Sequence, residues 1–496
     1  MSKLEVGKGA AYLFIENIIA GFSAYGFWLI MSRITTVEVI GTSSAIVSLA
    51  GIFVVIVGVG IPTGIQRFLG KSFSEQKIED AKMYVKTSLL IVSIGIIVGT
   101  TVILIAKDWI YDAVRFDSNL IIISIIFIAS YAISTLFRSV IIASIKTKIL
   151  VIVSILSSIA KFTIAIILVL IGTGALGVTI GFTSFSILGL IILAFTIMTT
   201  FKRSKDKPKV SFSNSFRNIV IASMASWVPG LISTIGSQLG TIVVFGSQGA
   251  SQAGLYFVAF SIVLGISTIM SVLSVIAFPI LSAMHDGRKR FTWRVIKMSL
   301  LISLPFSSSI IFYSKEVMQL FGQGYSEGSS SLEILLLSML PTAIMTGTNI
   351  LVYSYGNYRQ VLAIGLATSI PRTLLYFILV PIFGGTGAAI SYTIGSVIGF
   401  IVSIVISKKV GMQIFWKELA YILVIPTTVG FLLSYFGINY IVGIFATLIL
   451  SYILFLKLLI ITRSDIHDSL RILPYSISNP IINIFNILEK KLNGSY

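Results

Sequence analysis

The chain has 496 residues, of which 56% are hydrophobic and only 11% charged, with a net charge of +18 and a mean hydropathy of +1.01. Soluble domains carry about 25% charged residues, so this composition excludes an ordinary soluble protein. The chain has no cysteine, and its two histidines, His285 and His467, lie in polar connecting segments. Disulfides and thiolate metal sites are therefore excluded, and no metal site or other cofactor is predicted.

Fourteen apolar runs of helical length follow one another along the chain. A bilayer core about 30 Å thick is crossed by about 20 apolar residues in a helix, and these runs reach that length. The sequence therefore predicts an all-α polytopic membrane protein with about fourteen transmembrane helices. The predicted spans are residues 10–33, 39–66, 86–106, 119–143, 149–171, 175–200, 217–245, 252–283, 293–313, 332–354, 360–383, 387–407, 416–436 and 440–462.

The positive charge is distributed unevenly between the two sides of the predicted membrane. The odd-numbered gaps between spans hold only Arg33, Lys107, Arg115 and Lys315, whereas the termini and the even-numbered gaps hold thirty of the 36 basic residues. Because basic residues retain loops in the cytoplasm, both termini are predicted to be cytoplasmic. The same rule accounts for the net charge, so nucleic acid is not expected as a partner.

An internal repeat divides the chain at the basic segment 201–217. The Gly-Thr-Gly-Ala turn at 172–175 matches the turn at 385–388, an offset of 213 residues, and Gly41 aligns with Gly254 at the same offset. Pro62 and Pro279 are predicted to end the second helix of each half. Six spans in each half bring the second unit to the same side as the first, so the repeats are parallel.

These boundaries predict five segments. Residues 1–205 form an N-terminal six-helix bundle, and 206–213 form a basic cytoplasmic linker. Residues 214–408 form a C-terminal six-helix bundle, followed by two further helices within 409–465. The tail, 466–496, has apolar residues at helical spacing and basic ends, which predicts an amphipathic segment on the inner membrane surface.

Several local patterns resemble one superfamily of membrane transporters. In "IMSRITTVEVIGTSSAIVSLAGIF", Arg33 closes the first helix and Gly41 opens the second, and "VGIPTGIQRFLGKSFSEQK" contains Gly60 and Arg67. With the Gly-Thr-Gly-Ala turns and the 6 + 6 + 2 helix order, the chain resembles the multidrug/oligosaccharidyl-lipid/polysaccharide (MOP) flippases. Within that superfamily it is similar to the oligosaccharide flippases. The resemblance implies a cationic central cavity and a fold that opens on alternate sides.

Two cations lie near the centres of predicted spans. Lys161 falls in the middle of 149–171 and Arg372 in the middle of 360–383, at roughly equivalent places in the two halves. A charge at that depth costs about 3 kcal/mol on insertion scales, and such residues usually face a cavity or a partner. No acidic residue lies near the centre of any predicted span. We therefore expect Lys161 and Arg372 to bind an anion, such as the phosphate or diphosphate of a lipid-linked sugar.

Each of these charges also has a structural interpretation. Lys161 could pair with Glu16 and join the first and fifth helices. Arg372, which follows Pro371, could cap backbone carbonyls that the proline leaves free. Arg138 lies near the cytoplasmic end of its span, where it either anchors the helix or guides a substrate headgroup. Glu16 is a candidate residue for coupling to H⁺ or Na⁺, with a paired or neutral carboxyl as the alternative.

The predicted function is a flippase that moves a polyprenyl-phosphate- or diphosphate-linked oligosaccharide from the cytoplasmic to the outer leaflet for surface polysaccharide or glycan assembly. The alternative is a multidrug or cation antiporter of the same superfamily, although such a protein should favour acids in its cavity. Short outer loops without a catalytic arrangement argue against an enzyme. The expected location is the cell membrane. The expected partners are the lipid-linked oligosaccharide and membrane lipids, with glycan polymerases or glycosyltransferases as further candidates.

Overall fold

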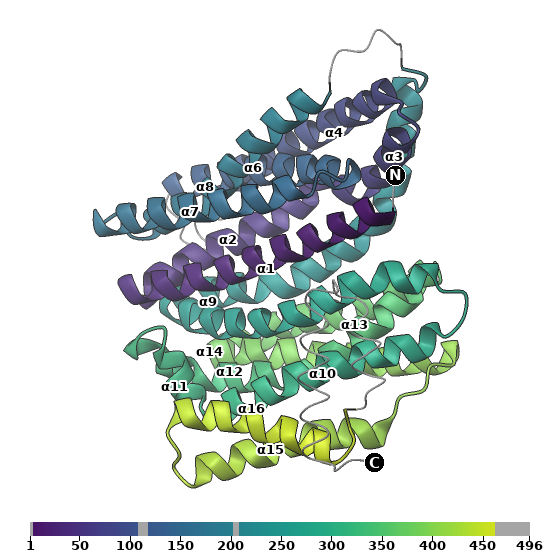
Figure 1. Ribbon diagram of the computed structural model, residues 1–496. Helices are drawn as coiled ribbons and strands as arrows, with labels where there is room; N and C mark the ends of the chain where they lie inside the picture. Colours follow the sequence, from purple (N-terminus) through teal and green to yellow (C-terminus); the bar gives the residue numbers. More distant parts are fainter. Residues whose placement is uncertain (1–2, 108–117, 202–207, 462–496) are drawn as a thin grey trace. The chain divides into compact units, whose positions relative to one another are not determined.

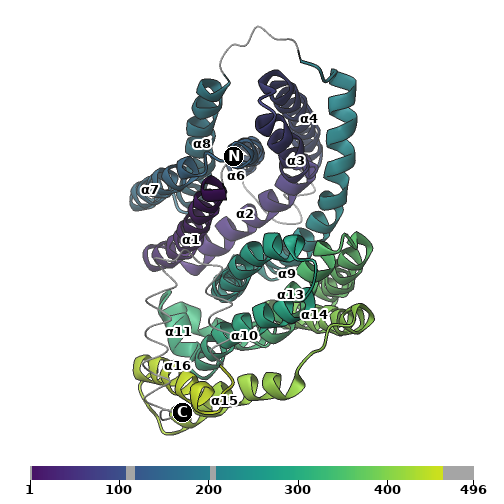
Figure 2. The ribbon, with the colours of Figure 1, turned by 45° about the vertical axis from the view of Figure 1, so that its right-hand side comes forward.

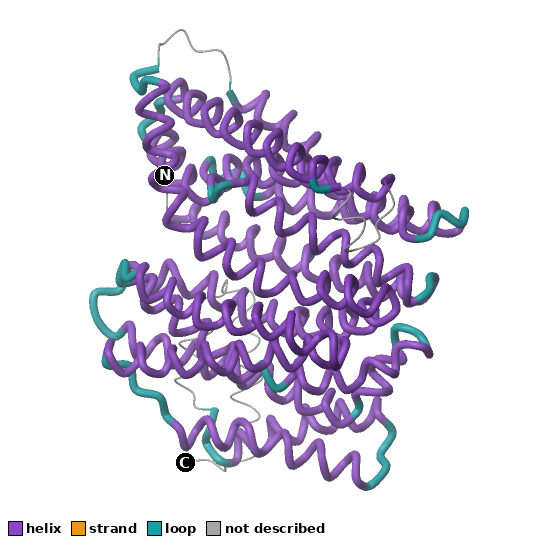
Figure 3. The backbone as a smooth tube through the Cα atoms, turned by 180° about the vertical axis from the view of Figure 1, so that it is seen from behind, coloured by secondary structure: helices purple, strands orange, loops and turns teal. Residues whose placement is uncertain are grey.

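The computed structural model describes residues 3–107, 118–201 and 208–461 (Figure 1). Every regular element in these ranges is helical, and Figure 3 shows no strand among them. The predicted amphipathic tail, 466–496, lies outside the described residues. The elements are α1 (Lys3–Ile34), α2 (Val37–Gly58), α3 (Ile61–Ser74), α4 (Ile78–Ile105), α6 (Ser118–Ala143), α7 (Lys148–Leu170), α8 (Ala175–Thr200), α9 (Phe212–Ala283), α10 (Arg288–Phe312), α11 (Ser314–Gln319), η1 (Gln323–Gly328), α12 (Ser329–Leu336), α13 (Met339–Ser354), α14 (Tyr358–Val410), α15 (Trp416–Tyr435) and α16 (Tyr440–Lys457).

Eleven helices in the described part of the chain are long and apolar enough to cross a membrane, or twelve if the bent pair Gln323–Leu336 and Met339–Ser354 forms one span. An all-helical, multi-pass membrane protein is thereby confirmed. Two of the eleven, Ser226–Ala283 and Tyr358–Val410, have 58 and 53 residues. At 1.5 Å per residue each is about 80 Å long or more, well beyond the thickness of a bilayer core.

A glycine with non-helical backbone angles interrupts each of these long helices. Gly249 in α9 has φ 85° and ψ −179°, and Gly384 in α14 has φ 57° and ψ −134°. Positive φ is readily available to glycine because it has no Cβ. The chain therefore changes direction at these two points without leaving the helical state for more than one residue.

The second predicted span, 39–66, is wrong as a single helix. It breaks after Gly58, and α3 begins at Ile61. Pro62 therefore starts a helix, whereas the sequence predicted that it ends one, because proline is well tolerated in a first turn whose N–H groups need no partner. Pro279 likewise does not end its helix, since α9 continues to Ala283.

The described chain divides by its contacts into two compact units. Unit 1 comprises Met1–Phe257 with Thr373–Ala388, and unit 2 comprises Val258–Arg372 with Ala389–Tyr496. The predicted six-helix bundles, 1–205 and 214–408, stay a prediction.

In unit 1, α7 and α8 pack closely along much of their length, as Figures 1 and 2 both show. Small residues permit this approach. A Cβ added to Gly181 of α8 would lie 2.4 Å from the Cβ of Ala165 on α7, so a larger side chain has no room there. Helix α1 packs on α7, and α6 packs on α8. These four helices carry the first of the midspan cations.

In unit 2, α10 is the helix around which others gather, since it packs on α13, α15 and α16. The Lys297 ammonium lies 2.9 Å from Oε2 of Glu418, which ties α10 to the start of α15. A Cβ on Gly430 of α15 would lie 2.9 Å from the ring of Phe312. The two additional C-terminal helices are thus held on this unit by an ion pair and by close packing.

Candidate substrate site

Lys161 lies in the middle of α7 and is almost completely buried, with 3% of its surface exposed. Its ammonium group donates a hydrogen bond to the backbone carbonyl of Ser23 on α1, with a nitrogen–oxygen distance of 3.1 Å. It forms no ion pair with any carboxylate of the described residues. A buried cation at the centre of an apolar helix therefore has a neutral partner in place of a counterion.

Four phenyl rings surround the Lys161 ammonium. The distances from Nζ to the ring centroids are 5.1 Å for Phe27, 5.4 Å for Phe162, 5.8 Å for Phe182 and 5.3 Å for Phe185. Each lies within the 6 Å over which an aromatic face attracts a cation, by about 0.5–2 kcal/mol. We call Phe27, Phe162, Phe182 and Phe185 the aromatic cage. It stabilises a positive charge without neutralising it.

The aromatic cage was not predicted from the sequence. Its members come from α1, α7 and α8, and only Phe162 is a neighbour of Lys161 in the sequence. Phe182 and Phe185 do share one face of α8 at a spacing of three residues, which is a weak signal. Nothing in that spacing identifies the residue that the rings face.

Glu16 and Arg138 form an ion pair between α1 and α6, with 2.5 Å between Nη2 of Arg138 and Oε2 of Glu16. Glu16 is buried, whereas 37% of the Arg138 side chain is exposed. The pairing of Glu16 with Lys161 that the sequence left open is absent. The reason is that Lys161 is directed into the aromatic cage, and the Glu16 carboxylate is taken by a cation from a third helix.

Arg372 lies in α14 and is also buried, with 5% of its surface exposed. Its guanidinium carbon lies 3.7 Å from the centroid of the Tyr392 ring, a stacked cation–π contact. Nη2 donates to the hydroxyl of Ser396 at 2.8 Å. Gly395 makes room for the side chain, because a Cβ there would lie 2.7 Å from the Cβ of Arg372.

The two midspan cations therefore share a kind of environment, since each is buried against aromatic rings and hydrogen bonded to a neutral oxygen. Lys161 belongs to unit 1 and Arg372 to unit 2. That they line one cavity, and that they bind substrate, stays a prediction, as do the roles of Arg138 and Glu16.

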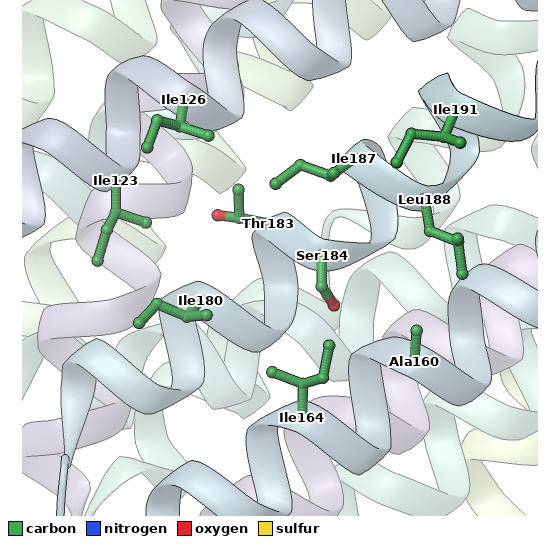
Figure 4. A pocket seen from close by; sticks show the side chains of 10 residues that line it. All are labelled: Ile123, Ile126, Ala160, Ile164, Ile180, Thr183, Ser184, Ile187, Leu188 and Ile191. Atoms are coloured by element: carbon green, nitrogen blue, oxygen red, sulfur yellow. The ribbon is translucent and has the colours of Figure 1, made fainter. Parts of the chain in front are cut away.

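An apolar groove of about 400 Å³ lies over α8 between α6 and α7 (Figure 4). Its two hydroxyl groups are satisfied within α8 itself: Thr183 donates to the carbonyl of Thr179, and Ser184 donates to that of Gly181, each at 2.7 Å. The groove therefore presents only hydrocarbon. Its lining residues are Ile123, Ile126, Ala160, Ile164, Ile180, Thr183, Ser184, Ile187, Leu188 and Ile191.

Among the residues that the structure describes, no group of three acidic or histidine side chains is placed to hold a metal ion. The candidate site is thus an arrangement of cations, aromatic rings and apolar surface.

Comparison with known proteins assigns the chain to a family. The sequence pattern of the polysaccharide biosynthesis protein family matches residues 6–285, more than half of the chain, and the chain belongs to that family. A search of curated proteins finds no matching sequence.

Solved structures share the fold at low sequence identity. The lipid II flippase MurJ in an inward closed conformation superposes with a TM-score of 0.69 at 16% identity, covering 91% of this chain and 99% of that one. An inward-facing multidrug resistance MATE family transporter of the MOP superfamily gives 0.61 at 16% identity, covering 79% and 93%. A MOP superfamily transporter from Pyrococcus furiosus gives 0.58 at 16% identity, covering 81% and 95%. The chain has the fold of these flippase and transporter structures.

Proposed function

We propose that this protein is a flippase, which moves a polyprenyl-phosphate- or diphosphate-linked oligosaccharide from the cytoplasmic to the outer leaflet of the cell membrane. The observation that carries the proposal is Lys161, a buried cation at the middle of α7 that has no carboxylate partner among the described residues. A phosphate is the anionic part of such a substrate. Family membership in polysaccharide biosynthesis supports a glycan as the cargo.

Binding begins when the phosphate meets Lys161. The aromatic cage attracts the ammonium, but the rings hold it less strongly than an ion pair would in a dry interior. Because no carboxylate has to be displaced, an incoming phosphate gains the full charge-assisted hydrogen bond. Arg372 provides a second, forked donor for the same phosphate group, and the sugars occupy the cavity between the halves.

Translocation follows by alternating access. Residues 1–205 and 214–408 rock against each other and expose the cavity first inward and then outward. The scheme uses the fourteen predicted spans. Dividing α9 at Gly249 and α14 at Gly384 adds two crossings to the eleven helices, and the bent pair α12–α13 adds one more. With fourteen crossings both termini would lie on one side of the membrane, and the basic loops support the cytoplasmic side.

The polyprenyl tail follows the groove between α6, α7 and α8 as the headgroup crosses. Ala160, which lines the groove, is adjacent to Lys161, and Thr183 and Ser184 lie between Phe182 and Phe185 of the aromatic cage. The same helical turns therefore bear the cation on one face and the hydrocarbon groove on another. A polyprenyl tail whose phosphate is bound at Lys161 would therefore begin beside the groove. The predicted helices 13 and 14, now α15 and α16, are the other candidate path.

Coupling to H⁺ or Na⁺ through Glu16 is part of the proposal. Protonation of the Glu16 carboxyl removes its attraction for Arg138 and loosens the link between α1 and α6, which would trigger the rocking. The cation antiporter is less well supported, since Glu16 is already neutralised by Arg138 and the aromatic cage is filled by Lys161 itself. Glycan polymerases or glycosyltransferases are the proposed partners on either side of the membrane.

The proposal is tested in a strain that lacks the protein. Wild type and the double variant Lys161→Ala plus Arg372→Ala are expressed at matched membrane levels, and lipid-linked oligosaccharide is measured on each side of the membrane. Lys148→Ala is the matched control, because Lys148 is an exposed cation at the start of the same helix. We expect cytoplasmic accumulation with the double variant alone. Unchanged export would make both cations structural.

A further inference from the structure

The joint between α2 and α3 has an unusual backbone. Val59 has φ 46° and ψ 30°, and Gly60 has φ 66° and ψ 4°, so two consecutive residues are left-handed. Glycine adopts this conformation freely, but a β-branched residue there is a genuine outlier. Strain of this kind persists only where surrounding contacts hold it in place, and it clusters at sites that change conformation.

The break at Val59 releases one backbone carbonyl. In a continuous helix the N–H of Val59 would donate to the carbonyl of Val55, four residues earlier. Here it donates to Ile56 instead, with a nitrogen–oxygen distance of 3.3 Å. The Val55 carbonyl is taken by the indole N–H of Trp227, at 2.8 Å. Trp227 lies in α9, 172 residues away and in the second predicted half of the chain.

The joint is enclosed by two neighbouring helices. On the α9 side, a Cβ added to Gly60 would lie 2.6 Å from the carbonyl oxygen of Ser223 and 2.8 Å from the Cβ of Trp227. On the α4 side, a Cβ on Gly95 would lie 2.4 Å from the carbonyl oxygen of Val57. Ser223 and Trp227 are one helical turn apart, so a single face of α9 supports the broken form.

We propose that the Val55 carbonyl is a two-position conformational switch. In the state seen here it accepts from Trp227, and α2 and α3 are separate helices (Figure 1). In the other state it accepts from Val59, whose backbone becomes helical, and α2 and α3 join into one kinked helix. The two hydrogen bonds share one acceptor, so each weakens the other, and the bond from Val59 forms only when the Val59 backbone becomes helical.

Each of the two states has its own energetic cost, so neither is strongly favoured, and a bistable element requires such a balance. The broken state holds Val59 in a left-handed conformation. The joined state carries Pro62, which has no N–H to donate and whose ring crowds the carbonyl four residues earlier, so that the helix kinks there. The hydrogen bond from Trp227 thus couples the conformation of the joint between α2 and α3 to its contact with α9. This inference concerns the motion of the chain and does not depend on the identity of the substrate.

The test measures the distance between α2 and α3 directly. The chain has no cysteine, so Glu38→Cys on α2 and Lys71→Cys on α3, both at exposed positions, can be spin labelled without background. A continuous helix would separate these positions by about 50 Å, and a break brings them closer. Four further substitutions are placed in this labelled protein: Trp227→Phe, Val59→Ala, Val59→Gly and, as a control, Trp293→Phe.

Trp227→Phe keeps the ring and removes the N–H donor, so we expect a roughly two- to tenfold shift toward the longer distance. Val59→Ala favours the helical backbone and shifts the population the same way, whereas Val59→Gly relieves the strain and favours the shorter distance. Trp293 is buried and its indole N–H has no partner among the described residues, so Trp293→Phe should leave the distance unchanged. The proposal is overturned if the distances in all Trp227 and Val59 variants match the wild type.

Discussion

Gly41 on α2 and Gly254 on α9 pack backbone against backbone. A Cβ added to Gly41 would lie 1.8 Å from the carbonyl oxygen of Ala250, and one added to Gly254 would lie 2.3 Å from that of Val37. These glycines are equivalent positions of the predicted repeat, 213 residues apart. Both glycines lie in unit 1, and the repeat itself stays a prediction.

We predict that Gly41→Ala or Gly254→Ala destabilises the protein by about 1–3 kcal/mol, because the new methyl group meets backbone atoms that have no room to move. Thermal unfolding in detergent measures the effect. Gly230→Ala is the matched control, since a Cβ at Gly230 of α9 meets nothing within 4 Å. It should be neutral or slightly stabilising. Equal stability of all three variants would contradict the close approach of α2 and α9.

Lys161→Met should separate stability from transport. Methionine has a similar length and suits a cage of phenyl rings, and replacing a buried charge by an apolar group is often neutral or stabilising. We expect an unchanged or higher melting temperature together with loss of export. Lys148→Met, at the exposed start of α7, should change neither quantity. A Lys161→Met protein that melts earlier but still exports would assign Lys161 a structural role.

The Glu16–Arg138 pair can be examined by a double-mutant cycle. Because 37% of the Arg138 side chain is exposed, we expect a coupling energy of only about 1 kcal/mol between Glu16→Gln and Arg138→Gln. Export is then measured against pH. If Glu16 carries the coupling proton, Glu16→Gln abolishes the pH dependence of export, whereas Arg138→Gln retains it. A pH dependence that survives Glu16→Gln would remove Glu16 from the coupling mechanism.

Filling the groove should alter the response to tail length. Ala160→Phe places a ring among the isoleucines that line the groove, and we expect it to slow the flipping of long-chain polyprenyl substrates several-fold while sparing short-chain analogues. Ile167→Phe, at a lipid-exposed position of the same helix, is the control. The measurement is the ratio of translocation rates in vesicles. An unchanged ratio would contradict the groove as the path of the polyprenyl tail and would favour α15 and α16.

The local sequence was sufficient to predict the class of the protein and the positions of most of its helices. The spans predicted at 149–171 and 175–200 correspond to α7, Lys148–Leu170, and α8, Ala175–Thr200. The two midspan cations were also evident from the sequence. This success has a simple cause: crossing a membrane requires an uninterrupted apolar run, which is a property of consecutive residues.

The partners of the charged residues were decided only by tertiary structure. The sequence left open whether Glu16 meets Lys161, and the structure pairs it with Arg138, while three helices bring the aromatic cage to Lys161. The break after Gly58 was missed for the same reason. Its apolar run continues unbroken, but an indole 172 residues away takes the Val55 carbonyl. Apolarity places a helix in the membrane, whereas the choice among polar partners depends on which helices become neighbours.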